Sequence, residues 1–338
     1  MPRVTISDVA RRAGVSPTTV SFTFNRPWEL NPETVERVLK AAREMGYAPN
    51  PHARALLSSR VGVLGLLVPE RIFDAFANPF YASLVQGVGA ACNRHGLSMM
   101  VVSPIDGSLE KAITKAPVDG FIMVGLDENH RDISPLSRRG VPFVIVDGEA
   151  EKAPSVNIED ERGAYEAASR LLSGGHEEVA VLSFLKPRKY RHEPYHDVGE
   201  RRVRGYRRGF EERGFPWKNR LVVPSPCSIE GGRRCFLEIW ESGRRPTAVL
   251  SMSDAAALGV LGAARELEVR VPDDLEVVGF DDVPASRVAY PALSTVRQPI
   301  VEKGETAANL LAEALDVGRR SRRQVLLPTE LVLRETTR

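Results

Sequence analysis

Disulfides, zinc clusters, membrane spans and catalytic loops are all missing from this sequence, and each absence excludes a class of protein. Its 338 residues contain three cysteines without CxxC spacing, which favours neither a disulfide framework nor a zinc site. The longest nearly apolar run, residues 61–68, is far shorter than the roughly 20 residues that cross a bilayer, and no apolar leader opens the chain. There is no P-loop, no nucleophile elbow and no GxGxxG loop after a strand. We therefore predict a cytoplasmic protein that is not an enzyme and uses neither a metal nor a cofactor.

Length and charge indicate two parts of unequal size. A chain of 338 residues exceeds the size at which one hydrophobic core stops growing, so more than one folding unit is expected. Residues 1–60 contain nine Lys and Arg against five Asp and Glu, a balance of +4; the whole chain carries +2, which leaves −2 for residues 61–338. A small basic module ahead of a larger acidic one is typical of nucleic-acid binding, although this balance does not identify it alone.

The first 60 residues predict an all-α module of three helices. Thr5 is a candidate N-cap with an acidic residue three positions later, so a first helix is expected over residues 6–13, ended by Gly14. Ser16 and Pro17 start a second helix, and a later Asn-Pro pair starts a third. Two short helices joined by a glycine turn and braced by a third form a helix-turn-helix, whose second helix enters the major groove of DNA.

Candidate DNA contacts gather on the second helix and around it. Val20 is expected to face inward, which leaves base-reading side chains on the other side: Pro17, Thr18, Ser21 and Phe22. Short polar side chains suit phosphate oxygens: Thr5, Ser7, Ser16, Thr19 and Asn25. Any one of these could instead be a helix cap or a solvated hydroxyl, so the prediction depends on their joint pattern.

Two motifs in this module resemble a known family. VTISDVARRAGVSPTTVS at residues 4–21 and GYAPNP at residues 46–51 resemble the N-terminal module of the lactose-repressor/galactose-repressor family of bacterial transcriptional regulators. The resemblance implies a DNA contact at Tyr47.

The resemblance also implies a hinge helix over residues of about 50–58 that folds only on DNA. Leu56 from each subunit of a dimer then wedges into the minor groove, with Asn50 and Ala53 beside it. Such a wedge unstacks one base step and bends the duplex toward the protein. As an alternative, Leu56 could anchor the core of the next domain.

Phe22 departs from the family pattern, because many members carry an arginine or another polar residue there. A phenyl ring can touch a thymine methyl group but cannot form a bidentate bond to guanine. The base that residue 22 reads is therefore not predicted.

Short apolar runs recur along residues 61–338 and predict buried parallel strands. They cover residues 61–68, 97–102, 120–124, 143–146, 179–184, 248–251 and 275–280. Amphipathic segments between them predict helices over residues 81–94, 162–172, 202–213 and 254–266. This alternation indicates an α/β fold of doubly wound sheets, and about ten strands fit two lobes better than one.

The family resemblance extends over this larger part and implies the two-lobed architecture of periplasmic binding proteins. It is carried by VDG at residues 118–120, GH at 175–176, GFDD at 279–282 and LPTEL at 327–331. We expect a first lobe over about 61–159 plus 293–322, and a second over about 160–292 plus 323–338.

A ligand in such sheets lies beyond the carboxyl ends of the strands. Asp147, Ser253 and Asp281 follow predicted strands, and carboxylates there can accept pairs of hydroxyl groups from a sugar. Asp281 could instead cap a turn, and Asp147 could pair with a surface arginine. A cationic loop over residues 186–197 is either a solvated loop or a lid over an anionic effector.

The resemblance implies four further effector contacts. Arg202, at the start of a predicted helix, matches an effector-binding arginine and can donate a planar fork, while Phe80 and Tyr81 match a stacking position. Cys227 stands where several members have an aromatic residue, which suggests a smaller or differently shaped ligand. The alternatives are that Phe80 is core and that Arg202 lies on a solvated helix face.

We predict a repressor that binds a pseudo-palindromic operator in double-stranded DNA as a homodimer or a dimer of dimers. A sugar or other polar metabolite between the lobes changes the distance between the two hinge segments. The alternatives are a transport-type sugar-binding protein without operator binding, and a regulator that answers a partner protein. Whether the effector releases or promotes DNA binding is left open.

Overall fold

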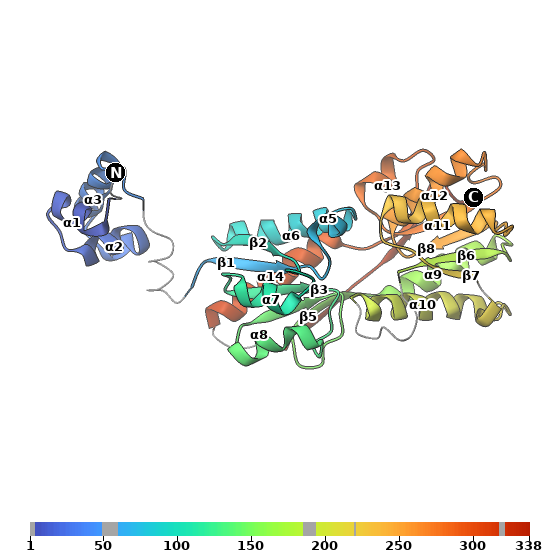
Figure 1. Cartoon of the computed structure of the whole chain (residues 1–338), viewed down its shortest axis with the longest axis horizontal. Helices are drawn as coiled ribbons and strands as arrows, with labels where there is room; N and C mark the ends of the chain where they lie inside the picture. The colour runs from blue at the N-terminus through green and yellow to red at the C-terminus, as the bar shows by residue number, and fades with distance from the viewer. Residues whose placement is uncertain (1–3, 49–59, 185–193, 220, 318–321) are drawn as a thin grey trace. The chain divides into compact units, whose positions relative to one another are not determined.

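The chain divides into two compact units, residues 1–61 and residues 62–338, each with its own hydrophobic core. The computed structural model describes residues 4–48, 60–184, 194–219, 221–317 and 322–338 (Figure 1). The predicted hinge helix, with Asn50, Ala53 and Leu56, lies outside the described residues, as does most of the cationic loop.

The first unit is a three-helix module (Figure 1). Its elements are α1 (Ile6–Ala13), α2 (Pro17–Asn25), a 3-10 turn η1 (Pro27–Glu29) and α3 (Pro32–Glu44). Val9, Val20 and Val38 come one from each helix and are completely buried. The core is therefore built from one apolar side of each helix.

The turn between α1 and α2 is fixed by its own residues. The side chain of Thr5 accepts a hydrogen bond from the amide of Asp8, whose carboxylate accepts one from the amide of Thr5, so the expected capping box is present. Gly14 ends α1 at a φ of +67°, a left-handed conformation that costs glycine little. Ser16 then caps α2 by accepting from the Thr19 amide.

The second unit contains two six-stranded sheets, one in each lobe. The first sheet has the order β11-β5-β4-β3-β1-β2, with β1 (Val63–Leu67), β2 (Ser98–Val102), β3 (Gly120–Val124), β4 (Phe143–Val146), β5 (Ser155–Ile158) and β11 (Gln324–Leu327). The second has the order β12-β10-β9-β8-β6-β7, with β6 (Val179–Ser183), β7 (Leu221–Pro224), β8 (Ala248–Ser251), β9 (Glu276–Asp281), β10 (Ser294–Arg297) and β12 (Glu330–Val332). Neighbouring strands are parallel, except that β12 is antiparallel to β10.

Helices cover these sheets. In the first lobe they are α5 (Ile72–Ala75), α6 (Phe80–Arg94), α7 (Leu109–Lys115), η2 (Arg131–Ile133), α8 (Ser134–Arg139) and α14 (Ile300–Val317). In the second lobe they are α9 (Asp160–Ser173), α10 (His196–Glu211), η4 (Trp217–Asn219), α11 (Ile229–Glu241), α12 (Asp254–Glu266) and α13 (Pro284–Val288). Within the described ranges, none of them is long and apolar enough to cross a membrane.

Alternate residues of the strands point to opposite helical layers. Ile122 and Val124 of β3 pack into the core that includes α6 and α14, whereas Phe121 and Met123 pack into the core that includes α7. Both faces of the sheet are therefore covered, which explains why its strands are continuously apolar.

The chain crosses between the lobes three times, after β5, β10 and β11. The predicted boundaries were wrong at the last two crossings. β10 was expected in the first lobe but pairs with β9 in the second, and β11 was expected in the second lobe but pairs with β5 in the first. β10 follows α13 of the second lobe, and β11 follows α14 of the first lobe. Each strand therefore pairs with the sheet of the lobe in which the chain already lies, and the chain crosses to the other lobe afterwards.

Candidate functional site

The helix α2 is most exposed at its N-terminal end. Pro17 and Thr18 are exposed, Ser21 and Phe22 are half-buried, and Val20 is buried in the core of the first unit. The side chains predicted to read bases thus share the side of the helix that faces away from the core.

Several residues predicted to contact phosphates also cap helices. Thr5 and Ser16 are the N-caps of α1 and α2, and the Thr19 hydroxyl is 2.9 Å from that of Ser16. Asn25 is exposed and donates through Nδ2 to the Ser21 carbonyl at 3.0 Å. The capping role foreseen as an alternative is therefore present, but a hydroxyl has two lone pairs and can also meet a phosphate.

Two other predicted contacts lie at the edges of the module. Ser7, in the first turn of α1, is exposed. Tyr47 is half-buried, with its ring centroid 5.8 Å from that of Phe24.

A cavity of about 40 Å³ lies between the two lobes of the second unit. All seven residues predicted to bind an effector line it: Phe80, Tyr81, Asp147, Arg202, Cys227, Ser253 and Asp281. Seven other residues complete the lining: Glu70, Asn78, Phe184, Tyr195, Val198, Met252 and Gln298. The structure thus brings together residues that lie up to 228 positions apart in the sequence (Glu70 to Gln298).

Arg202 is buried at this cavity, and its guanidinium contacts a carboxylate, a backbone carbonyl and an aromatic ring. Its Nε donates to Oδ1 of Asp160 at 2.9 Å, Nη1 donates to the Met252 carbonyl, and the guanidinium carbon lies 3.6 Å from the centroid of the Phe280 ring. The expectation that Arg202 starts its helix was wrong, since α10 begins six residues earlier at His196.

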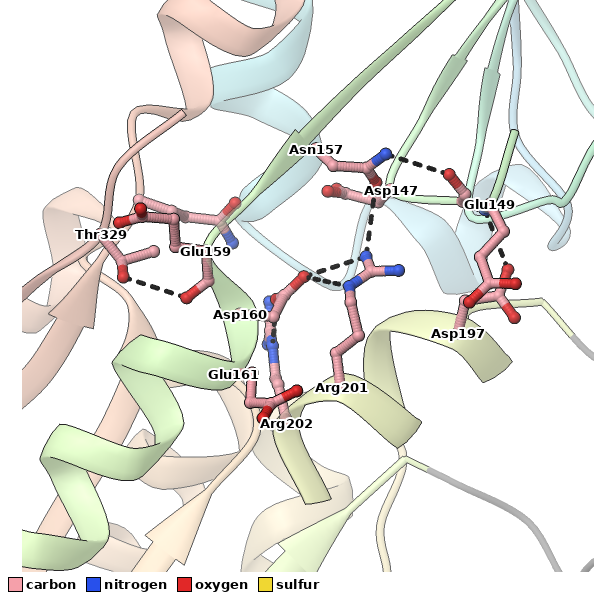
Figure 2. A network of polar contacts seen from close by, with 12 residues as sticks. Asp147, Glu149, Asn157, Glu159, Asp160, Glu161, Asp197, Arg201, Arg202 and Thr329 are labelled. Atoms are coloured by element: carbon pink, nitrogen blue, oxygen red, sulfur yellow. Dashed lines mark hydrogen bonds and ion pairs between the residues drawn. The ribbon is translucent and has the colours of Figure 1, made fainter. Parts of the chain in front are cut away.

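The neighbouring arginines face elsewhere. Arg201 bonds the other oxygen of Asp160, as Figure 2 shows, and Arg204 pairs on the surface with Glu161 at 3.0 Å. Of these three arginines, Arg202 alone lines the cavity.

A chain of buried hydrogen bonds runs along the cavity wall from one lobe to the other. The ammonium group of Lys303 donates to Oδ1 of Asp147 at 2.6 Å and to Oε1 of Gln298, and Nε2 of Gln298 donates to Oδ1 of Asp281. Asp147 directly follows β4 of the first lobe, Asp281 ends β9 of the second, and Gln298 lies in a crossing between the lobes. Asp147 therefore pairs with a buried lysine, not with a surface arginine as the alternative held.

Lys303 and Gln298 were not among the predicted site residues. A lone lysine in an amphipathic helix normally indicates an exposed position, because lysine is almost never fully buried. No signal in the sequence alone would have identified Lys303 as a residue of the site.

Burial raises the pKa values of three groups at the cavity, the phenol of Tyr81 among them. It raises the pKa of Asp281 to about 7, although the positive charge of Arg202 opposes the shift. Burial likewise raises the pKa of the Cys227 thiol to about 12. Near neutral pH the cavity thus contains a neutral thiol and a carboxyl group whose neutral form is favoured by burial.

The remaining predicted residues have structural contacts as well. Ser253 is the N-cap of α12 and accepts from the Ala256 amide at 3.2 Å. Phe80 and Tyr81 belong to the core of the second unit and meet edge to face, with centroids 5.6 Å apart. Among the residues that the structure describes, no three His, Cys, Asp or Glu side chains gather as metal ligands.

Two family models match this chain. "Bacterial regulatory proteins, lacI family" matches residues 5–50, and "Periplasmic binding protein-like domain" matches residues 168–337. The chain is also 32% identical over 346 residues to the HTH-type transcriptional regulator DegA of Bacillus subtilis (strain 168), a match that covers 99% of this chain and 98% of that protein. The chain belongs to the lacI family.

Solved structures of lacI-family proteins share its fold. The lac repressor dimer bound to operator and the anti-inducer ONPF matches with a TM-score of 0.81 and 26% identity, over 99% of each chain. The complex of the transcriptional regulator CelR with cellobiose matches with a TM-score of 0.71 and 29% identity, over 99% of this chain and 100% of that one. Membership of the lacI family confirms the predictions of a helix-turn-helix ahead of a two-lobed α/β domain and of a DNA-binding regulator that is not an enzyme.

Proposed function

We propose that this chain represses transcription from an operator that it reads with the exposed side of α2, under the control of a small molecule bound between the lobes. The observation that carries the proposal is the joint presence of both sites in one chain. One is the exposed N-terminal end of the second helix of a helix-turn-helix, and the other is a cavity lined by aromatic side chains and by carboxylates at the ends of strands from both lobes.

At the DNA, Pro17 and Thr18 are the side chains best placed to reach base edges. Phe22 would contact a thymine methyl group. The Arg26 guanidinium, whose central carbon lies 5.8 Å from the centroid of that ring, would exchange its surface ion pair with Glu29 for a phosphate. Ser21 lies on the same side of α2 as these base-reading side chains. Phosphate contacts would come from Thr5, Ser7, Ser16, Thr19 and Asn25, with a further DNA contact at Tyr47. The hinge contacts at Asn50, Ala53 and Leu56 remain a proposal from the family motif.

The assembly we propose is a homodimer on a pseudo-palindromic operator, in the cytoplasm, where the DNA is. The lac repressor structure that this chain resembles is a dimer bound to operator. Two helix-turn-helix modules related by a two-fold axis require two related half-sites.

The effector we propose is an uncharged molecule rich in hydroxyl groups, such as a sugar. Among the residues that the structure describes at the cavity, the cations Arg202 and Lys303 already have carboxylate partners, which favours an uncharged ligand over an anionic one. Phe80, Tyr81 and Phe184 offer aromatic surface for the apolar face of a sugar ring. The CelR structure, which contains cellobiose, supports this class of ligand.

Selection of DNA fragments by the purified full-length protein tests the proposal. Sequencing of bound fragments from a genomic library should reveal one pseudo-palindromic motif. Thr18→Ala and Phe22→Ala should reduce its enrichment about tenfold or more, because a lost base contact costs about 1–3 kcal/mol. Thr114→Ala, on α7 of the second unit, is the matched control and should enrich the same motif. Equal recovery of all fragments by the unmodified protein would refute operator binding.

A further inference from the structure

Tyr195 lies where the cavity between the lobes meets a much larger groove. The groove has a volume of about 1000 Å³ and shares five lining residues with the cavity: Glu70, Asn78, Phe184, Tyr195 and Cys227. We propose that Tyr195 closes the cavity against this groove by latching the second lobe onto the first, and so limits the size of the effector. The inference rests on the proposed function of the cavity.

The backbone of Tyr195 is the first anchor of this latch. Tyr195 directly precedes α10 of the second lobe, and its amide donates to the carbonyl of Gly125 at 2.7 Å. Gly125 directly follows β3 of the first lobe, so this hydrogen bond joins the two lobes.

The ring of Tyr195 is the second anchor. It lies so close to Gly125 that a Cβ atom at position 125 would be 2.5 Å from two ring carbons. Only a glycine leaves room for the ring there. The hydroxyl group of Tyr195 is hydrogen-bonded to that of Tyr81 on α6, which is also in the first lobe.

Asp197 supplies a third anchor from the same short segment. Its carboxylate accepts a hydrogen bond at 3.0 Å from the amide of Glu149, which follows β4 in the first lobe, as Figure 2 shows. Residues 195–197 thus contact the ends of β3 and β4 and the first turn of α6.

The backbone conformation of Tyr195 indicates that its contacts with the first lobe hold it in place. Its φ is +61°, a left-handed value that is rare for a bulky residue and persists where the surroundings over-determine it. Here the surroundings are the contacts with Gly125 and Tyr81 in the other lobe. A ligand too long for the cavity would have to displace the ring of Tyr195 to extend into the groove.

Alkylation of the native cysteines tests the latch without knowledge of the effector. Cys227 lies at the boundary between the cavity and the groove and is half-buried, whereas Cys92 and Cys235 are buried in the hydrophobic cores and report any general loosening. The full-length, ligand-free protein is treated with iodoacetamide or with a bulky fluorescein maleimide, and modification of each cysteine is followed by peptide mass spectrometry. In the unmodified protein, Cys227 should react slowly, and more slowly with the bulky reagent.

Tyr195→Ala should accelerate modification of Cys227 on the order of tenfold by local opening, with the larger gain for the maleimide, and leave Cys92 and Cys235 unchanged. Gly125→Ala should act in the same direction from the other lobe, because its methyl group displaces the ring. Tyr165→Ala is the matched control. Tyr165 is also half-buried, and its hydroxyl bonds Glu212 on the neighbouring helix, away from the cavity.

The latch is overturned if Cys227 reacts at the same rate in the unmodified protein, Tyr195→Ala and Gly125→Ala. It is equally overturned if all three cysteines accelerate together, because Tyr195 would then support the fold as a whole. Operator selection by the same preparations separates the two proposals: its failure would refute the proposed function, while the alkylation rates would still decide whether Tyr195 closes the cavity.

Discussion

The ammonium group of Lys303 is completely buried, and its charge is balanced inside the protein by the carboxylate of Asp147 at 2.6 Å. Taking either ion out of water alone costs several kcal/mol, so each makes the burial of the other tolerable. The pair joins α14 to the end of β4, and through Gln298 it reaches the second lobe.

Lys303→Met should therefore be strongly destabilising, because it leaves the Asp147 carboxylate buried without its cation. We expect the free energy of unfolding, measured by urea denaturation at pH 7, to fall by about 3–5 kcal/mol. Lys111→Met is the matched control: Lys111 is exposed and pairs with Asp106 on the surface, so its loss should change stability by about 1 kcal/mol or less. An equal change in the free energy of unfolding in the two variants would show that the buried pair contributes no more to stability than the surface pair.

The cavity residues divide into those that sequence reasoning finds and those that only the fold reveals. Asp147 and Asp281 follow apolar strands, and the carboxyl ends of parallel strands meet at one edge, so their convergence is predictable. Lys303 lies instead within a long helix, and Tyr195 in a loop; neither position has a local signal for a cavity. Their roles depend on contacts with segments more than 60 residues away.

At the scale of elements, glycines set how closely helix pairs pack. A Cβ atom at Gly87 of α6 would lie 1.9 Å from the Val301 carbonyl of α14, and one at Gly304 of α14 would lie 2.4 Å from the Leu84 carbonyl of α6. The pair α11 and α12 repeats the arrangement, since a Cβ atom at Gly232 would lie 2.0 Å from the Ala256 carbonyl. These backbones touch directly, so any added methyl group must separate them.

Gly87→Ala should force α6 and α14 apart and lower the thermal midpoint of unfolding. Overpacking of this kind costs about 1–3 kcal/mol. Gly89→Ala, two residues along the same helix, is the matched control, because nothing lies within 4 Å of a Cβ atom there. It should be neutral or stabilising by up to about 1 kcal/mol, because alanine favours the helix. Comparable losses in both variants would contradict a packing effect.

The elements that sequence reasoning finds are those with strong local patterns. Each of the seven apolar runs contains a strand of the structure, and the helix expected over residues 254–266 has those bounds. Two of the missed strands are short and carry polar residues, namely β10 with the sequence STVR and β12 with ELV. Strands of this kind are stabilised by their neighbours in the sheet, which a local pattern does not contain. The prediction placed β10 and β11 in the wrong lobes for the same reason.

At the scale of the whole molecule, the effector cavity and the crossings between the lobes share residues. Gln298 bonds Asp281 and Lys303 within the segment that leads from β10 to α14. A ligand that contacts Asp147 or Asp281 therefore acts directly on a connection between the lobes. Effector control requires only that the ligand bind one arrangement of the lobes more tightly than another.

The central claim is that occupancy of this cavity changes affinity for the operator. The most direct test is a fluorescence-anisotropy titration of labelled operator with the full-length protein, with and without the dialysable small molecules of the cells that produce it. We predict that the extract changes the operator Kd of the unmodified protein by about tenfold or more, a coupling of about 1.4 kcal/mol. We predict further that Asp281→Ala binds the operator but no longer responds. An operator Kd that is the same with and without the extract, or an unchanged response in Asp281→Ala, would contradict the account.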